Sequence, residues 1–272
     1  QHIIISGFSD QKLQLAKELS GADEVMNSSK LSIEERRAII HKYNHKNGAD
    51  VVFQCAGSQY AFRDGVDLLK NVGTLVEIGN IGTNCYVISD DQGTCAIIDC
   101  DGNPQPLFRY IEENSLKPTH ILLTHGHDDH IGAVEMVKEK YGCPVYACKK
   151  EQALLADPAL NCSLYMSGPT SLSADVWVQE GDAVKVGDLE FTVLETPGHT
   201  AGSVCYLIGN NIFSGDTLFQ GSCGRTDLPT GNWGEIIASL KRLRNLPGDY
   251  NVYPGHGPST TMEIERRMNP YM

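Results

Sequence analysis

The most informative segment of the sequence reads Ile121-Leu122-Leu123-Thr124-His125-Gly126-His127-Asp128-Asp129-His130. An apolar strand runs directly into the pattern H-x-H-x-D-H, and we expect a helix to follow from about Ile131. Imidazoles crowded in this way would repel one another if protonated, and would leave unmet donors if neutral and buried. A divalent cation resolves the conflict because it takes the imidazole lone pairs. The segment therefore predicts a metal centre at the end of a strand.

Three more segments repeat the order of apolar strand, glycine-containing turn and candidate ligand. The candidate ligands are His199, Asp216 and His256, and they follow the strand-like residues 189–195, 211–214 and 251–253. Glycine lets the backbone bend sharply at such turns. Strand ends that share one edge of stacked sheets would gather these side chains into a single cleft. The sequence thus predicts one site assembled from four distant segments.

This set of residues resembles the metallo-β-lactamase superfamily over residues 82–272. The resemblance also rests on Gly82-Thr83-Asn84-Cys85-Tyr86, Ile97-Ile98-Asp99, Gly224-Arg225-Thr226-Asp227-Leu228-Pro229, Pro254-Gly255-His256-Gly257-Pro258 and Asn269-Pro270. The last of these features resemble the small glyoxalase II-like branch, of the hydroxyacylglutathione hydrolase type. The resemblance implies an α/β fold, the αββα sandwich, in which two sheets lie back to back with helices outside.

The resemblance also implies which metal ion each candidate ligand holds. One metal would be held by His125, His127 and His199, and the second by Asp129, His130 and His256, with Asp216 as the bridge. All seven positions of a binuclear pattern are filled, which disfavours a mononuclear site. We expect two zinc ions, although imidazole and carboxylate ligands suit iron or manganese as well.

A binuclear centre of this kind predicts a thioester hydrolase. Two cations lower the pKa of a shared water, and the metal-bridging hydroxide would attack the carbonyl carbon of an acyl-thiol. Asp129 would orient that water or accept its proton, and is the predicted catalytic residue. Arg225 could bind an anionic thiol carrier through charge-assisted bonds, or could instead pair with Asp227 or Glu235. Asp99 is expected either to hold the ligand loop by hydrogen bonds or only to form a turn.

Three other functions stay open. An iron-dependent persulfide dioxygenase, an oxidoreductase, shares H-x-H-x-D-H, whereas a flavin-linked di-iron reductase would place a carboxylate at His127. A non-catalytic binding protein is disfavoured by the complete ligand set. A nuclease is disfavoured by charge, because residues 81–272 carry 13 basic and 24 acidic groups and would repel a phosphate backbone. We therefore expect a small acyl-thiol substrate and no nucleic acid.

Residues 1–80 alternate strand-like runs with helical patterns. The runs are 2–6, 24–27, 51–55 and 73–78, an order that predicts parallel βαβ units. The segment resembles part of the coenzyme domain of medium-chain, zinc-type alcohol dehydrogenases, through Leu15-Ala16-Lys17-Glu18-Leu19, Gly21-Ala22-Asp23, Gly48-Ala49-Asp50-Val51-Val52 and Gly73-Thr74-Leu75-Val76. The G-x-G-x-x-G turn is not found, so no NAD(P) binding is expected.

We predict two parts of the chain, a truncated Rossmann-like segment over 1–80 and the metal hydrolase domain over 81–272. The first part could serve packing or mediate a homo-oligomer. No apolar run approaches the roughly 18 residues of a membrane span, and no basic segment precedes a signal-peptide core. We therefore expect a cytoplasmic protein without membrane contact.

Overall fold

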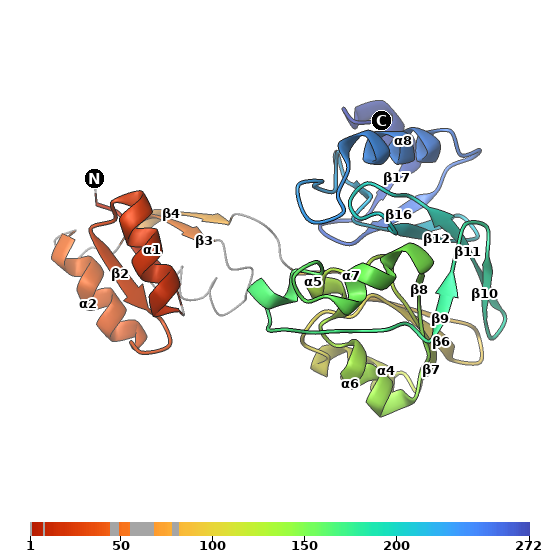
Figure 1. Cartoon of the computed structure of the whole chain (residues 1–272), viewed down its shortest axis with the longest axis horizontal. Helices are drawn as coiled ribbons and strands as arrows, with labels where there is room; N and C mark the ends of the chain where they lie inside the picture. Colours follow the sequence, from red (N-terminus) through yellow and green to blue (C-terminus); the bar gives the residue numbers. More distant parts are fainter. Residues whose placement is uncertain (1, 8, 44–48, 55–67, 78–81) are drawn as a thin grey trace. The chain divides into compact units, whose positions relative to one another are not determined.

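The computed structural model describes residues 2–7, 9–43, 49–54, 68–77 and 82–272. The chain divides into two compact units, residues 1–81 and residues 82–272, which are described separately (Figure 1). None of the described helices combines the length and the apolar character that a membrane crossing requires.

The first unit contains the predicted parallel βαβ arrangement. Strand β1 (Ile4–Gly7) pairs in parallel with β2 (Glu24–Asn27), and α1 (Asp10–Ser20) connects them. Helix α1 begins where the Ser9 side chain accepts a bond from the Lys12 amide, and ends at Gly21 with a φ of 68°. The sequence predicts an apolar stripe on this helix that includes Leu13, Leu15 and Leu19. Leu13 is buried, whereas Leu15 and Leu19 are exposed.

The rest of this unit contains a second pair of parallel strands. Helix α2 (Ile33–Tyr43) follows β2, and β3 (Ala49–Gln54) pairs in parallel with β4 (Leu69–Glu77). The sequence also predicts a helix over Tyr60–Lys70. Most of that helix lies outside the described residues, and its last two residues belong to β4. The α/β character of this unit agrees with the expected truncated Rossmann-like segment.

The second unit begins with a five-stranded sheet in the order β5-β6-β7-β8-β9. Strands β5 and β6 are antiparallel, and every other neighbouring pair is parallel. The strands are β5 (Tyr86–Ser89), β6 (Thr94–Ile98), β7 (Lys117–Leu122), β8 (Val145–Cys148) and β9 (Val176–Val178).

A six-stranded sheet follows in the order β10-β11-β12-β13-β16-β17. Only β13 and β16 pair in parallel. The strands are β10 (Ala183–Val186), β11 (Leu189–Glu195), β12 (Val204–Ile208), β13 (Asn211–Gly215), β16 (Asn251–Pro254) and β17 (Thr260–Thr261). A separate small hairpin joins β14 (Leu218–Phe219) to β15 (Ser222–Cys223).

Helices cover the outer faces of both sheets (Figure 1). Around the first sheet they are α4 (Gln105–Glu113), α5 (Asp128–Ile131), α6 (Val134–Tyr141) and α7 (Gln152–Ala156), the last preceded by the 3-10 turn η1 (Lys149–Glu151). On the second sheet they are α8 (Trp233–Arg244) and α9 (Met262–Met268). A further 3-10 turn, η2, spans Ser163–Tyr165.

Within residues 82–272, alternating side chains of the strands contribute to three apolar cores. Ile97 of β6 packs outward with α4 and α6, whereas its neighbours Ala96 and Ile98 pack inward against the second sheet. In β11, Val193 faces the first sheet and Leu194 faces α8. Successive strand residues point to opposite faces. The four layers are therefore helices, sheet, sheet and helices, which confirms the expected αββα sandwich.

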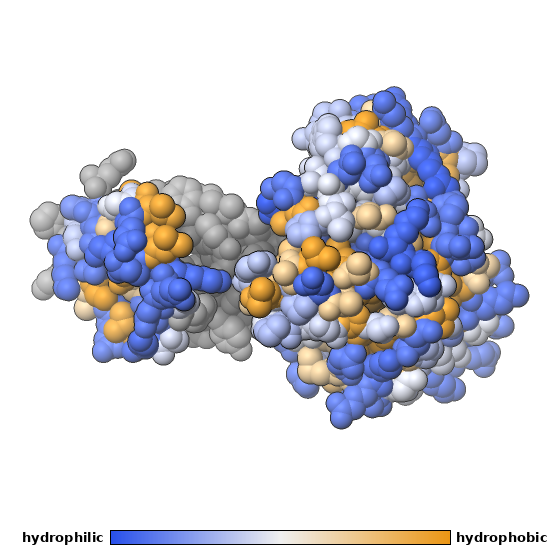
Figure 2. Space-filling model, in the orientation of Figure 1, coloured by the Kyte–Doolittle hydropathy of each residue, from blue (hydrophilic) through white to orange (hydrophobic). Residues whose placement is uncertain are grey.

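Hydrophilic side chains cover much of the visible surface of residues 82–272, with apolar patches between them (Figure 2). The helix predicted near residues 131–141 corresponds to α6, which begins at Val134, and the short helix α5 precedes it from Asp128 to Ile131. His130 therefore lies on a short helix and not in the preceding loop.

Candidate metal centre

The structure brings all seven predicted ligand residues together at one end of the two sheets. His125 and His127 lie in the loop after β7, and Asp129 and His130 lie on α5. The other three, His199, Asp216 and His256, follow β11, β13 and β16, as the sequence predicts. Three groups have ligand atoms within 4.8 Å of one another: His125, His127 and His199; His125, His130 and Asp216; Asp129, His130 and His256.

Buried atoms without hydrogen bonds test whether metal ions fit this centre. The Nε2 atoms of His125, His127 and His130 and the Oδ1 atom of Asp216 are buried and have no hydrogen-bond partner. Leaving such an atom unpaired costs about 1–3 kcal/mol, and His125, His130 and Asp216 form one of the groups whose ligand atoms lie within 4.8 Å of one another. Imidazole nitrogens and a carboxylate oxygen are ligands of zinc and iron. The residues present therefore fit a binuclear metal site.

Asp99 fixes the orientation of His130. Its Oδ2 atom lies 2.8 Å from His130 Nδ1 and also accepts the Thr124 hydroxyl at 2.8 Å. Its Oδ1 atom accepts the Thr124 amide at 2.8 Å. Because an ionised carboxylate only accepts hydrogen bonds, Asp99 keeps a proton on His130 Nδ1 and leaves Nε2 as the nitrogen that faces the centre. Such a partner is what a metal-binding histidine requires.

A backbone carbonyl performs the same task for His199. Its Nδ1 atom lies 2.7 Å from the carbonyl oxygen of Arg225, so Nδ1 carries the proton. The other ring nitrogen, Nε2, lies 2.8 Å from His127 Nδ1 and 3.5 Å from Asp216 Oδ2. His199 therefore turns its Nε2 lone pair toward the centre.

Close packing fixes the turns that carry these ligands. Gly198 adopts a φ of 138°, and a Cβ there would lie 2.2 Å from the backbone nitrogen of Ile236 in α8. A Cβ on Gly224 would lie 1.9 Å from the carbonyl oxygen of Asp216. Larger residues at either position would displace a ligand segment, which explains why glycine stands there.

The carboxylates lie in the middle of the centre. Asp216 Oδ1 is 3.3 Å from His130 Nε2, and its Oδ2 is 3.4 Å from His256 Nε2 and 3.5 Å from His199 Nε2. Asp129 Oδ2 is 3.1 Å from His256 Nε2 and accepts the Thr83 hydroxyl at 3.0 Å. Asp216 thus contacts histidines of more than one group, as a bridging residue would.

The pKa values describe the charges of the metal-free centre. Burial raises the pKa of Asp129, but His130 and His256 outweigh it and hold that pKa below its usual range. Burial lowers the pKa of His256, whereas hydrogen bonds to Asp129 and Asp216 raise it to about 10. Burial and then His199 lower the pKa of His127 to about 3. Without metal, the positive charge that the carboxylates require is therefore supplied by protonated histidines.

Arg225 does not join the ligand groups. Its guanidinium forms hydrogen bonds of 2.6 and 2.7 Å to Asp227, and both side chains are largely exposed. The sequence allowed this pair as the alternative to substrate binding. The backbone of Arg225 has the more direct contact with the centre, through His199.

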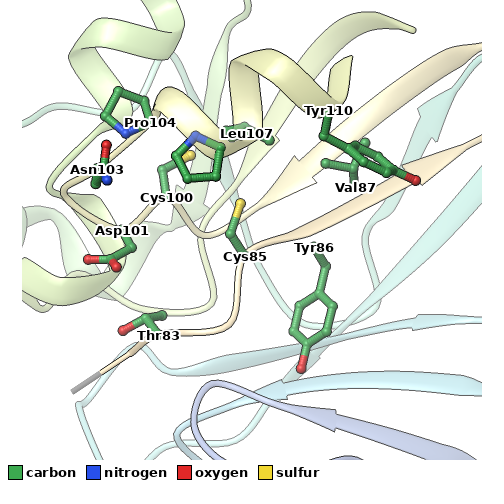
Figure 3. A pocket seen from close by; sticks show the side chains of 11 residues that line it. Thr83, Cys85, Tyr86, Val87, Cys100, Asp101, Asn103, Pro104, Leu107 and Tyr110 are labelled. Atoms are coloured by element: carbon green, nitrogen blue, oxygen red, sulfur yellow. The ribbon is translucent and has the colours of Figure 1, made fainter. Parts of the chain in front are cut away.

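A cavity of about 430 Å³ adjoins the centre at Thr83. Figure 3 shows Cys85, Cys100, Leu107 and Tyr110 around it, with Asp101 near the Thr83 end. None of the seven predicted ligands lines it, so it is distinct from the metal centre. Thr83 connects the two, because its hydroxyl reaches Asp129.

Two contacts that support the centre have no signal in the sequence. Glu151 accepts amides of two ligand loops, and the Asp128 carboxylate accepts the amide and the hydroxyl of Ser167. Both contacts join segments that are far apart in the chain and follow no local spacing. Glu151 stands in the polar run Lys149-Lys150-Glu151-Gln152, where an acidic residue is unremarkable.

Family models match both parts of the chain. The metallo-beta-lactamase superfamily matches residues 78–256, and a zinc-binding dehydrogenase family matches residues 2–95.

Relatives match the second unit along most of their own length. A protein of Bacillus subtilis named "Probable metallo-hydrolase YqgX" is 41% identical over 201 residues, which cover 72% of this chain and 94% of the relative. "Hydroxyacylglutathione hydrolase GloC" of Haemophilus influenzae is 36% identical over 196 residues, 70% of this chain and 92% of the relative.

One solved structure adds information on metal. The protein TTHA1623, crystallised "in a di-iron-bound form", is 37% identical, with a TM-score of 0.63 over 72% of this chain and 98% of that chain. A segment at the N-terminal side of the chain matches a zinc-binding dehydrogenase family. The fold, the clustered ligands and these relatives show that the chain belongs to the metallo-beta-lactamase superfamily.

Proposed function

We propose that this metallo-hydrolase cleaves the thioester bond of a small acyl-thiol of the hydroxyacylglutathione type. The observation that carries the proposal is the convergence of five histidines and two aspartates into ligand groups within 4.8 Å. The Haemophilus influenzae relative, named a hydroxyacylglutathione hydrolase, supports the substrate class.

Seven side chains would hold the metal ions. The first ion would be held by His125, His127 and His199, the second by Asp129, His130 and His256, and both by Asp216. Zinc is the expected metal, and the di-iron form of TTHA1623 makes iron the alternative. When bound, such a pair of ions supplies a nucleophile at neutral pH and polarises the carbonyl oxygen of the substrate.

Asp129 is the residue that would orient the attacking water. Its Oδ2 atom already accepts the Thr83 hydroxyl and faces His256. Because His130 and His256 keep its pKa low, it is a carboxylate at neutral pH and can accept a hydrogen bond from water. A thiolate leaves without a strong general acid. That agrees with the position of His120 on β7, where it contacts Thr119 and Tyr146 and not the ligand groups.

The substrate would be positioned partly by charge. Arg225 lies in the loop whose backbone holds His199, and its guanidinium could leave the exposed Asp227 to bind an anionic thiol carrier. Exposed ion pairs are weak, about 0–1 kcal/mol, so this exchange costs little free energy.

Purified protein tests the proposal through metal content and release of free thiol from an S-hydroxyacylglutathione. We expect two zinc ions per chain and thiol release that depends on them. His120→Ala is the matched control, because it removes a histidine outside the centre and should keep both properties. Metal-replete protein that releases no thiol would refute the thioester proposal. Oxygen uptake with a persulfide would instead favour the iron-dependent dioxygenase.

A further inference from the structure

A buried glutamate connects the two loops that carry the three-histidine group. Glu151 ends the 3-10 turn η1 and is 1% exposed. Its Oε2 atom accepts the amide of Gly126 at 2.8 Å, and its Oε1 atom accepts the amide of Gly202 at 2.8 Å. Gly126 lies between His125 and His127, and Gly202 lies three residues after His199.

Glycine at both positions allows this close approach. A Cβ on Gly202 would lie 2.7 Å from Glu151 Oε1 and from the Glu151 backbone nitrogen. A Cβ on Gly126 would lie 2.8 Å from the δ-carbons of Leu154 and Leu155 in α7. The segment from η1 through α7 therefore packs directly on both ligand loops, with no side chain between them.

In the described part of the chain, the hydrogen-bond partners of Glu151 belong to the ligand loops. Burial raises its pKa, whereas the Thr200 side chain and the amides of Gly126 and Gly202 lower it. Thr200 is adjacent to His199. Burying a carboxylate is expensive unless hydrogen bonds compensate for the lost water. A residue that served packing alone could be apolar. The presence of a carboxylate therefore indicates that its role is to accept the two backbone amides.

The comparison with Asp99 is informative. Asp99 contacts His130 directly and so serves the group of Asp129, His130 and His256. Among the described residues, Glu151 forms no hydrogen bond with a histidine ring, and it accepts backbone amides from the two loops of the group His125, His127 and His199. Each of these two groups thus has one further buried carboxylate beside it.

We propose that Glu151 is the positioning residue of the metal site formed by His125, His127 and His199, through its simultaneous bonds to the Gly126 and Gly202 amides. The proposal rests on the function proposed above in one respect, because it takes these three histidines to hold a metal ion. Glu151 touches neither metal nor substrate, and acts by holding the two loops at a fixed spacing.

Zinc binding to metal-free Glu151→Gln protein, measured with a competing chelator, tests the proposal. Whichever way the amide is turned, its NH2 group faces a backbone N–H donor, so one loop loses its acceptor. Loss of a residue that supports metal ligands lowers metal affinity by about 10–100-fold. We expect that loss for one of the two zinc ions. In a His256→Ala background, the remaining zinc should weaken by the same factor when Glu151→Gln is added.

Glu265→Gln is the matched control for loss of a buried carboxylate. Glu265 is 0% exposed and accepts bonds from the Gly221 amide, the Thr260 hydroxyl and the Asn269 side chain. It should lower the unfolding temperature of the metal-free protein as Glu151→Gln does, but leave both zinc affinities unchanged. If Glu151→Gln does not fold, Gly202→Ala pushes the carboxylate away from the second loop with its charge retained, and should weaken the same zinc ion.

The outcomes separate the two proposals. If the unmodified protein binds two zinc ions and Glu151→Gln binds both with unchanged affinity, Glu151 is not a positioning residue although the metal site stands. An equal loss in Glu265→Gln would also overturn the inference. If the unmodified protein binds no zinc, iron or manganese, the proposed function fails first.

Discussion

Replacement of Asp99 by asparagine should release one metal ion through a change of tautomer. Asp99 Oδ2 faces both the Thr124 hydroxyl and His130 Nδ1, while Oδ1 accepts the Thr124 amide. In Asp99→Asn the carbonyl oxygen must stay opposite the Thr124 amide, so the NH2 group takes the place of Oδ2. It can donate to the hydroxyl and to His130 Nδ1. His130 must then accept at Nδ1 and carry its proton on Nε2, the atom that faces the metal site.

The magnitude follows from the bonds lost. A hydrogen bond to a charged group contributes about 1.5–3 kcal/mol, and one such bond orients the metal-binding form of His130. That energy corresponds to about 10–100-fold in metal affinity. The affected ion is the one held by His130, and the ion held by the three-histidine group should change less.

Competition with a chelator measures both zinc affinities. Asp90→Asn is the control, because Asp90 accepts the amides of Gln92 and Thr94 at a turn away from the ligands. It should lower stability without changing zinc binding. Asp99→Asn protein that binds two zinc ions with unchanged affinity would refute the tautomer argument.

Three further changes follow from the packing, charge and substrate contacts. Gly198→Ala places a methyl group 2.2 Å from a backbone nitrogen of α8 and should lower the free energy of unfolding in urea by more than about 2 kcal/mol. The control Gly209→Ala has a φ of 55° and open space around the new methyl group, so it should lower that free energy by about 1 kcal/mol. Equal losses in the two variants would contradict the clash. The pKa of His256 is raised to about 10 in the folded protein. Protonated His256 therefore contributes its full share to the free energy of unfolding below about pH 6.5, and this contribution is lost as the pH rises toward 10. The Tm of the metal-free protein should fall over that range, and it should fall less in His256→Gln. Arg225→Ala should raise KM for an anionic acyl-thiol about two- to fivefold with little change in kcat, and Asp227→Asn should not raise it; a fall in kcat alone would argue against a binding role.

The sequence predicts the strands that carry the site because each is a short apolar run that ends at a glycine-containing turn. Residues 211–214 were predicted as a strand, and β13 is Asn211–Gly215; residues 251–253 were predicted, and β16 is Asn251–Pro254. The rule of strand, glycine turn and ligand therefore predicts that His199, Asp216 and His256 share one site with residues 125–130, as they do in the structure.

The features that could not be predicted depend on contacts between distant segments. The short strands β9, β14, β15 and β17 have two or three residues each, too few for a recognisable period. Glu151 meets Gly202 across 51 positions, and no local pattern marks such a contact. The partner of the Arg225 side chain stayed open in the sequence for the same reason, since several nearby acids could have paired with it.

Elemental analysis of the purified protein beside His125→Ala tests the central claim most directly. His125 belongs to two of the three ligand groups, so its loss should disturb both metal positions. We predict two equivalents of zinc or iron per chain in the unmodified protein, and loss of both metal and thioester hydrolysis in His125→Ala. Full metal content with unchanged turnover in His125→Ala would contradict the account.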